Sequence, residues 1–268
     1  MSSIVDISVV ILTWNSGKHI RTCVESTMED LLHCSLSFEI YVVDNGSKDN
    51  TREILEDLVS NHGDCVKPIY LENNMGTTFS RNLALKKAVG KYICIIDSDA
   101  YPMKGCFEQL LSRLTINPKI GIVVPKLVYP NGHYQKSTDV FPTIFQKIFR
   151  LFFLKYMEAK ETIPREGPVD YAISAFWMMK RELLKLVGYL DERIFYAPED
   201  VDYCLRVWKA GYSIYYVTDA TVVHDAQEIS RGIKINRATL NHMRGLSYYF
   251  RKHKYLFKRP GHIGLEQE

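Results

Sequence analysis

The sequence lacks the features that mark a membrane-spanning or disulfide-rich protein. Its uninterrupted apolar runs, such as residues 9–12, 92–96 and 151–154, are far shorter than the roughly 18 residues that a bilayer-spanning helix needs. The six cysteines form no CxxC pair and have no histidines at zinc-ligand spacing. No basic residue precedes the first apolar run, so we expect a first strand there and not a signal peptide. These absences predict a reduced, cytoplasmic protein.

Two glycine-rich phosphate-binding patterns are also absent. No GxGxxG follows the first predicted strand, and GxxxxGK[ST] does not occur. A dinucleotide-binding fingerprint and a P-loop are therefore excluded, so diphosphate binding would have to use a metal. The 268 residues are 46% hydrophobic and 24% charged, which is typical of a globular protein with a packed core.

Acidic residues are missing from most of the C-terminal tail, up to Glu266 and Glu268. Residues 229–265 contain nine Lys or Arg and no Asp or Glu, although the net charge of the whole chain is only +3. Such a basic block can face nucleic acid, phospholipid head groups or an anionic substrate, and charge alone does not choose among them.

The first hundred residues alternate β-rich runs with helix-period patterns. Strands are expected at 7–12, 38–43, 68–71 and 92–96, and helices at 19–32, 51–60 and 77–89. This alternation predicts an α/β fold with a Rossmann-like, doubly wound, mostly parallel sheet. The later elements are less regular and are expected at 105–115 (helix), 120–125 (strand), 169–179 (strand), 199–210 (helix), 213–217 (strand) and 220–224 (strand).

Polar residues follow three of the predicted strands, where ligands bind in sheets of this kind. They are Thr13-Trp14-Asn15, Asp44-Asn45-Gly46 and Asp97-Ser98-Asp99. Asp97 and Asp99 can both reach Mg²⁺ or Mn²⁺, which bridges the oxygens of a diphosphate. The alternative is that these two residues only cap the following turn.

Two further residues near the first strands admit two interpretations each. The Asp44 carboxylate can accept a hydrogen bond from a pyrimidine ring N–H, or it can close an Asx turn. Arg81 follows a helix break at Gly76 and can contact a base or a phosphate, or lie in solvent.

The C-terminal half offers three more candidates. Glu199 and Asp200 open a predicted helix, where the helix dipole stabilises acidic residues, but a carboxylate there can also act as a general base. His224 ends a predicted strand and is either a third metal ligand or a structural histidine.

Several ordered segments carry a family resemblance. They are VVILTWNSG, VVDNGSKDNT, NNMGTTFSRNLALKKAVGKYICIIDSDA, GYLDERIFYAPEDVDYCLRVWKAGY and VVHDAQEISR. In this order, from about Ile7 to Arg231, the chain resembles glycosyltransferase family 2 with the GT-A fold, in particular its rhamnosyltransferase-like branch. The resemblance implies a catalytic domain over residues 1–228, with a nucleotide-binding half at about 1–125 and an acceptor half at about 126–228. A basic amphipathic helical tail would follow at 229–268.

The resemblance also implies a role for each matching residue. The nucleotide-sugar donor would be held by Thr13, Asn15, Asp44, Gly76, Arg81, Asp97 and Ser98. Asp99 and His224 would bind Mn²⁺ or Mg²⁺. Asp200 would be the catalytic base, with Glu199 and Trp177 on the acceptor side. Residues 174–178 depart from the family pattern, because they lack its glycine.

The activity implied is inverting, metal-dependent transfer of a sugar to a hydroxyl of a glycan or lipid-linked glycan in polysaccharide biosynthesis. The expected donor is dTDP-rhamnose, with a UDP-sugar as the alternative. Other function classes are a nucleotidyltransferase and a non-enzymatic protein that binds nucleic acid or a membrane surface. No nucleic-acid partner is expected, because the tail aromatics follow helical spacing without a recognised motif.

Two amphipathic stretches could place the protein at the inner face of the cell membrane. Residues 141–157 are aromatic and basic and have no acid, and Leu240, Met243, Leu246 and Phe250 sit at helical spacing in the tail. Both stretches could lie in an anionic membrane interface. The alternative is that both pack on the catalytic domain.

Overall fold

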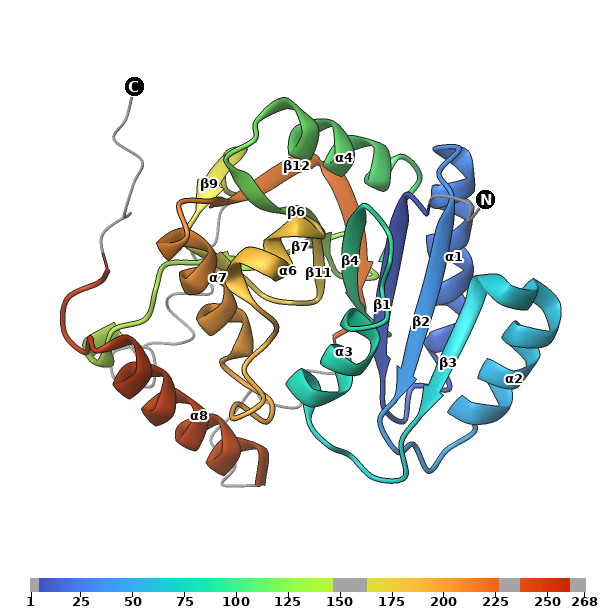
Figure 1. Ribbon diagram of the computed structural model, residues 1–268, viewed down its shortest axis with the longest axis horizontal. Coiled ribbons are helices and arrows are strands. Elements are labelled where there is room, and N and C mark those ends of the chain that lie inside the picture. The colour runs from blue at the N-terminus through green and yellow to red at the C-terminus, as the bar shows by residue number, and fades with distance from the viewer. Residues whose placement is uncertain (1–4, 147–162, 227–236, 261–268) are drawn as a thin grey trace.

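The structure, a computed structural model, describes residues 5–146, 163–226 and 237–260. One ten-stranded sheet runs through it, and eight of its strands lie in the order β3-β2-β1-β4-β11-β6-β12-β5 (Figure 1). Its N-terminal half consists of β1 (Ile7–Thr13), β2 (Phe38–Asp44), β3 (Val66–Tyr70) and β4 (Tyr92–Asp97). These strands are all parallel, as the alternation of strand and helix patterns predicts.

The second half of the sheet mixes directions. Strand β11 (Phe176–Lys180) runs antiparallel to β4 and β6 (Ile120–Val128), while β12 (Ser213–His224) is parallel to β6. The short β5 (Ala100–Pro102) pairs antiparallel with the end of β12. The other two strands of the sheet are β7 (Tyr134–Gln135), which pairs with β6, and β9 (Gly167–Val169), which pairs with β12. A separate pair is formed by β8 (Thr138–Asp139) and β10 (Tyr171–Ala172). The predicted α/β, mostly parallel fold is confirmed.

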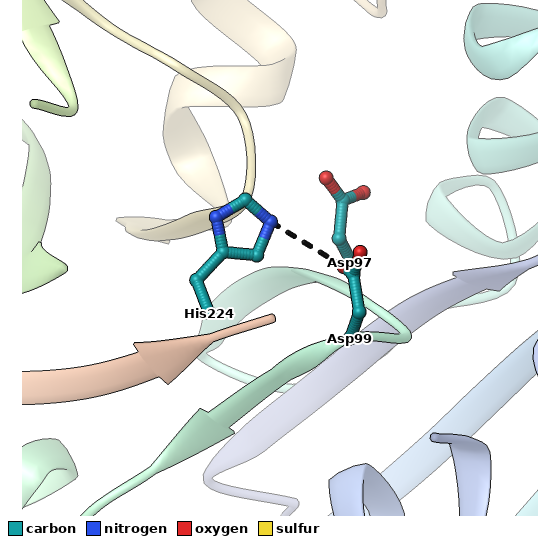
Figure 2. A group of neighbouring side chains, drawn as sticks. All are labelled: Asp97, Asp99 and His224. Atoms are coloured by element: carbon teal, nitrogen blue, oxygen red, sulfur yellow. Dashed lines mark ion pairs between the residues drawn. The ribbon is translucent and has the colours of Figure 1, made fainter. Parts of the chain in front are cut away.

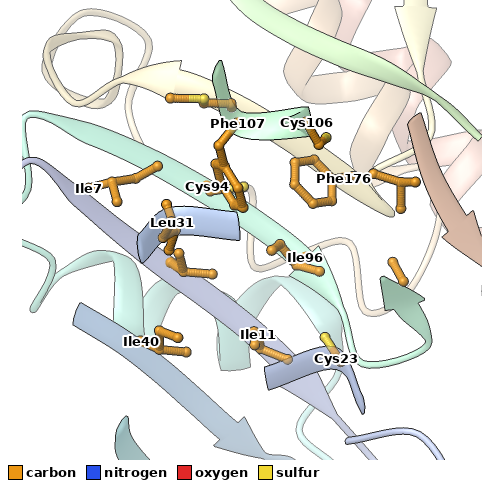
Figure 3. Packing of buried hydrophobic residues seen from close by; sticks show 14 of the residues in the cluster. Ile7, Ile11, Cys23, Leu31, Ile40, Cys94, Ile96, Cys106, Phe107 and Phe176 are labelled. Carbon is orange, nitrogen blue, oxygen red and sulfur yellow. The ribbon is translucent and has the colours of Figure 1, made fainter. Parts of the chain in front are cut away.

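Helices cover both faces of the sheet. Buried residues of α1 (Ile20–His33), α2 (Thr51–His62) and α4 (Cys106–Ile116) form one core cluster (Figure 3). Those of α3 (Thr77–Leu85), α6 (Glu182–Val187) and α7 (Glu199–Lys209) form the other. In β1, Ile7, Val9 and Ile11 face the first cluster and Val10 faces the second. Because both faces are buried, the strands are continuously apolar.

The structure differs from the sequence expectation in three elements. The helix expected at 77–89 ends at Leu85, and the chain then turns through Gly90, where a Cβ atom would lie 2.4 Å from the Ser8 nitrogen of β1. The strand expected at 169–179 is broken into β9, β10 and β11. The two strands expected at 213–224 are one strand, β12, with an irregular register between Val217 and Thr221.

The tail contains α8 (Arg237–His253), which packs on α7. Tyr249 and Phe250 are buried, and Lys252 Nζ lies 2.6 Å from Asp202 Oδ1. His253 Nε2 also lies 2.8 Å from Asp202 Oδ1. Of the expected apolar positions on this helix, Phe250 and Leu246 pack on the domain, whereas Met243 is 63% exposed. The side chain of Leu240 lies outside the described residues.

Membrane features are described only in part. Among the residues that the structure describes, none of the helices combines the length and the hydropathy of a bilayer-spanning helix. Of the aromatic stretch 141–157, residues 147–157 lie outside the described part of the chain.

Candidate active site

The site lies at the carboxyl edge of the parallel strands, where the sequence predicts that polar residues meet. Thr13 is opposite Asp44 in the β1–β2 pair, and Leu12 is opposite Asp97 in the β1–β4 pair. The backbone of β5, which starts directly after Asp99, pairs with β12 and sets His224 opposite Ala100. Strand register thus brings three distant segments of the chain to one place.

Asp97, Asp99 and His224 form a compact group of metal-ligand side chains (Figure 2). Their ligand atoms all lie within 4.8 Å of one another, and His224 Nε2 is 3.4 Å from Asp99 Oδ1. The other ring nitrogen, Nδ1, lies 2.8 Å from the amide oxygen of Gln135 on β7. Gln135 therefore holds the tautomer that leaves the Nε2 lone pair facing the carboxylates. Two carboxylates and an imidazole fit Mn²⁺ or Mg²⁺.

The charges in this group shift its titration. Burial by itself lowers the pKa of His224, but the carboxylates of Asp99 and Asp97 outweigh it, so the pKa of His224 is raised. Burial raises the pKa of Asp97, with Asp99 adding to the effect and Arg81 opposing it. Excess negative charge at this edge is what a divalent cation would relieve.

The remaining residues expected to hold the donor lie at the carboxyl ends of β1, β2 and β4. Asn15, in a left-handed backbone conformation with φ of 51°, accepts a hydrogen bond from Lys48 N at 2.7 Å. Thr13 is buried, and its hydroxyl has no hydrogen-bond partner among the described residues. Ser98 is also buried, and its hydroxyl donates to Ser16 Oγ at 2.8 Å.

Asp44 closes the loop that follows it, through the backbone N–H three residues on and not the one two residues on that an Asx turn would use. It is fully buried, its Oδ1 accepts from Ser47 N at 3.0 Å, and its Oδ2 accepts from Arg52 Nε at 2.5 Å. Its contact with a nucleotide base, implied by the family resemblance, remains a prediction.

Gly76, at the start of α3, packs against the loop that precedes α7. Its φ is 87°, and a Cβ atom on it would lie 2.4 Å from the Phe195 carbonyl oxygen. Next to it, Thr77 N donates to that same oxygen at 2.7 Å, and Thr78 Oγ1 donates to Ile194 O at 2.7 Å. The start of α3 and the loop 188–198 are thus held together.

Arg81 is buried and is not the solvated arginine that the sequence allowed. Its Nη2 donates to Asp97 Oδ1 at 2.5 Å, and its Nη1 donates to Ser174 Oγ at 2.8 Å. Its Nη1 is also 3.6 Å from Glu199 Oε1. The guanidinium therefore lies between the acids of the donor side and those of α7.

Glu199 and Asp200 open α7 beside Arg81. Glu199 is buried and accepts a hydrogen bond from Ser174 Oγ at 2.9 Å. Burial and then the charge of Asp200 raise the pKa of Glu199 to about 8, although Arg81 opposes the shift. Asp200 is half-exposed, and its Oδ1 accepts from Val201 N at 2.7 Å. Of the two acids, Glu199 holds a proton near neutral pH.

One predicted site residue is not at the site surface. Trp177 on β11 is fully buried and stacks on Tyr203 of α7, with 5.9 Å between ring centroids. Its aromatic side chain fills the core under α7, so it does not line an acceptor site directly. Sequence reasoning, in turn, missed Gln135, for which no motif gave a signal, and Ser174, which lies in the segment that departs from the family pattern.

The fold is that of the GT-A glycosyltransferases. The family model for glycosyl transferase family 2 matches residues 8–188. The chain belongs to glycosyltransferase family 2.

Curated relatives have glycosyltransferase names. A pre-mycofactocin glycosyltransferase from Mycobacterium tuberculosis is 27% identical over 220 residues, covering 82% of this chain and 43% of the relative. The glycosyltransferase GlyG of Streptococcus pneumoniae is 33% identical over 195 residues, covering 70% of this chain and 61% of the relative. An N-acetylglucosaminyl-diphospho-decaprenol L-rhamnosyltransferase from Mycobacterium tuberculosis is 24% identical over 234 residues, covering 81% of this chain and 75% of the relative. The chain thus spans less than two thirds of the length of the first two relatives.

Solved structures share the fold. GalNAc-T7 with UDP, GalNAc and Mn²⁺ superposes with a TM-score of 0.69 at 15% identity, covering 94% of this chain and 48% of that one. The mannosyltransferase PcManGT from Pyrobaculum calidifontis, in complex with GDP-Man and Mn²⁺, superposes with a TM-score of 0.66 at 19% identity. The match covers 98% of this chain and 68% of that one. At these identities the likeness establishes the fold alone.

Proposed function

We propose that this protein is a metal-dependent, inverting glycosyltransferase. Its donor is a nucleoside diphosphate sugar, dTDP-rhamnose first and a UDP-sugar second, and its acceptor is a hydroxyl of a glycan or lipid-linked glycan. The observation that carries the proposal is the convergence of Asp97, Asp99 and His224 at the strand ends, with the acids that open α7 joined to them through Arg81.

The arrangement suits a single displacement. When bound at Asp97, Asp99 and His224, a divalent cation would offset the negative charge of the diphosphate leaving group. Asp200 takes the proton of the acceptor hydroxyl, whose oxygen forms a bond to the anomeric carbon as the bond from that carbon to the diphosphate oxygen breaks. Since attack and departure occur on opposite sides, the configuration inverts.

The choice of Asp200 over Glu199 as the base follows from burial. Two adjacent carboxylates cannot both stay ionised at low cost when one of them is buried. Glu199 is the buried one, and its raised pKa of about 8 keeps a proton on it near neutral pH. Asp200, which is only partly buried, is the acid that an incoming hydroxyl can reach.

The proposal is tested by ligand-dependent thermal stability. The purified protein is heated with UDP, dTDP, GDP or CDP, each with and without Mn²⁺, because selective binding raises the melting temperature. The expected result is a rise for one pyrimidine diphosphate that requires the metal and disappears in Asp99→Ala. Stabilisation by none of the four nucleotides would contradict the proposal.

We further propose that one face of the molecule touches an anionic membrane surface at the cytoplasmic side. Phe145 and Phe257 are 64% and 65% exposed, with ring centroids 5.3 Å apart, and Ile144 N donates to Leu256 O. Exposed Lys258 and Arg259 follow Phe257 directly. Apolar rings flanked by cations suit an interface with anionic lipid.

Vesicle co-sedimentation tests this face. The protein should bind phosphatidylglycerol vesicles more tightly than phosphatidylcholine vesicles, and Phe145→Ser with Phe257→Ser should weaken binding about tenfold or more. Ile116→Ser is the matched control, since Ile116 is 73% exposed at the end of α4, across the molecule from α8 (Figure 1). Equal binding by the double variant and the wild type would contradict the membrane contact.

A further inference from the structure

Ser174 occupies a junction between the two acidic parts of the site. It lies just before β11, and it is only 6% exposed. Its hydroxyl accepts a hydrogen bond from Arg81 Nη1 at 2.8 Å and donates one to Glu199 Oε1 at 2.9 Å. A hydroxyl has one donor and two acceptor positions, so it can make both bonds at once. The serine thus bridges a buried cation and a buried acid.

The backbone around Ser174 is tied to the same groups. Its carbonyl oxygen accepts from Arg81 Nη2 at 3.2 Å, and the carbonyl of Ala175 accepts from Asp97 N at 2.9 Å. Arg81 Nη2 also donates to Asp97 Oδ1. None of these bonds uses the Ser174 hydroxyl, so Asp97 keeps its partners when that hydroxyl is removed.

The Ser174 hydroxyl links one buried cation to a second, buried acid. Arg81 is 1% exposed and is a single cation beside two acids. It contacts Asp97, and its Nη1 lies 3.6 Å from Glu199 Oε1. At that longer distance the guanidinium does not bond Glu199 directly, and the Ser174 hydroxyl supplies the connection. Without it, a buried guanidinium N–H and a buried carboxyl oxygen each lose a partner.

We propose that Ser174 is a positioning residue that, through Arg81, couples the donor-side acid Asp97 to Glu199 and so holds the start of α7 in the geometry that transfer needs. This inference rests on the proposed transferase function. Ser174 itself touches neither the donor nor the acceptor in this account. Its effect is on the acids that do.

The test is Ser174→Ala, with Ser174→Thr as the variant that keeps the hydroxyl. Ser174→Ala should lower kcat by about tenfold or more, the loss typical of a hydrogen bond to a charged group. The KM for the donor and the Mn²⁺-dependent thermal shift with the nucleotide should stay within about twofold of wild type. Ser174→Thr should recover most of the lost kcat.

Ser8→Ala is the matched control. Ser8 is also buried, donates to a buried glutamate, Glu39, at 2.6 Å, and accepts from Gly90 N at 2.8 Å, but it lies at the opposite end of β1. It should lower stability and leave kcat unchanged. An equal loss of kcat in Ser8→Ala, an unchanged kcat in Ser174→Ala, or a loss of nucleotide binding in Ser174→Ala would overturn the proposal.

A second measurement does not depend on transfer activity. Ser174→Ala removes a hydrogen bond that favours ionised Glu199, so its melting temperature should fall more steeply between pH 5 and 9 than that of the wild type or Ser8→Ala. The same slope in all three proteins would overturn the coupling. If the wild type transfers no sugar while Ser174→Ala still shows the steeper slope, the proposed function fails and the coupling stands.

Discussion

His224 Nε2 lies 3.4 Å from Asp99 Oδ1, although one residue ends β12 and the other follows β4. The pairing of β5 with the end of β12 produces this contact, because it sets His224 opposite Ala100. Gln135 then fixes the ring from behind through Nδ1. The metal-ligand group is therefore a property of strand pairing as much as of the three side chains.

Loss of Gln135 should weaken metal binding. In Gln135→Leu the His224 ring loses the partner of Nδ1, and its orientation and tautomer are no longer held, so affinity for Mn²⁺ should fall about 10- to 100-fold. Calorimetric titration with Mn²⁺ measures this. Gln109→Leu on α4, outside this group of side chains, serves as the control, and an affinity equal to wild type in Gln135→Leu would show that the glutamine does not support the ligand.

Asp200→Asn should separate donor binding from transfer. The amide keeps the shape of the side chain but cannot accept the hydroxyl proton, so kcat should fall by about 10²- to 10⁴-fold. The metal-dependent thermal shift with the nucleotide should remain, whereas Asp99→Ala should lose it. An Asp200→Asn enzyme with near wild-type kcat would remove Asp200 as the base.

Glu199 should make the stability of the protein depend on pH. Its pKa is raised to about 8 by burial, against an ordinary value of 4.5, so between these two pH values the folded state holds a proton that the unfolded state releases. This contribution to stability is fully present below about pH 4.5 and is lost as the pH rises through about 8.

The amide in Glu199→Gln does not titrate, so this variant should not lose stability as the pH rises through about 8. Its melting temperature relative to wild type should therefore rise as the pH is taken from 5 to 9 in thermal unfolding experiments. Glu192→Gln, which alters an acid paired with Lys86 at the surface, should keep the wild-type pH dependence. Parallel curves for Glu199→Gln and wild type would mean that Glu199 is ionised in the fold across this range.

Gly76→Ala should destabilise the protein more than a comparable glycine substitution elsewhere. Its φ of 87° and ψ of 167° belong to a region that is essentially restricted to glycine, and the added Cβ would meet the Phe195 carbonyl oxygen. Backbone strain and steric overlap together should lower the free energy of unfolding, measured with urea, by about 3 kcal/mol or more.

Gly105→Ala provides the comparison for Gly76→Ala. Gly105 has φ of 83° and ψ of 3°, and a Cβ atom added to it would have no neighbouring atom within 4 Å, so only the left-handed strain of about 1 kcal/mol applies. An equal loss of unfolding free energy in Gly76→Ala and Gly105→Ala would show that the loop 188–198 rearranges at little cost to accept the added Cβ atom.

Patterns along the chain are enough to predict the α/β class, the parallel half of the sheet and the kinds of residue at its carboxyl edge. These follow from local signals: continuous apolar runs that must be buried on both faces, helix-period patterns between them, and polar residues where each strand ends. For the same reason the sequence alone singles out Asp97, Asp99 and Asp200, because each stands at the end of a strand or the start of a helix.

Which of these side chains meet, and what surrounds them, depends on how the elements pack in three dimensions. Ser174 and Gln135 carry no motif, and their partners Arg81, Glu199 and His224 come from other elements. Burial likewise placed Trp177 in the core and Arg81 between two acids. Hydrogen-bond partners and desolvation depend on strand register and helix packing between distant segments, and a local pattern along the chain does not contain that information.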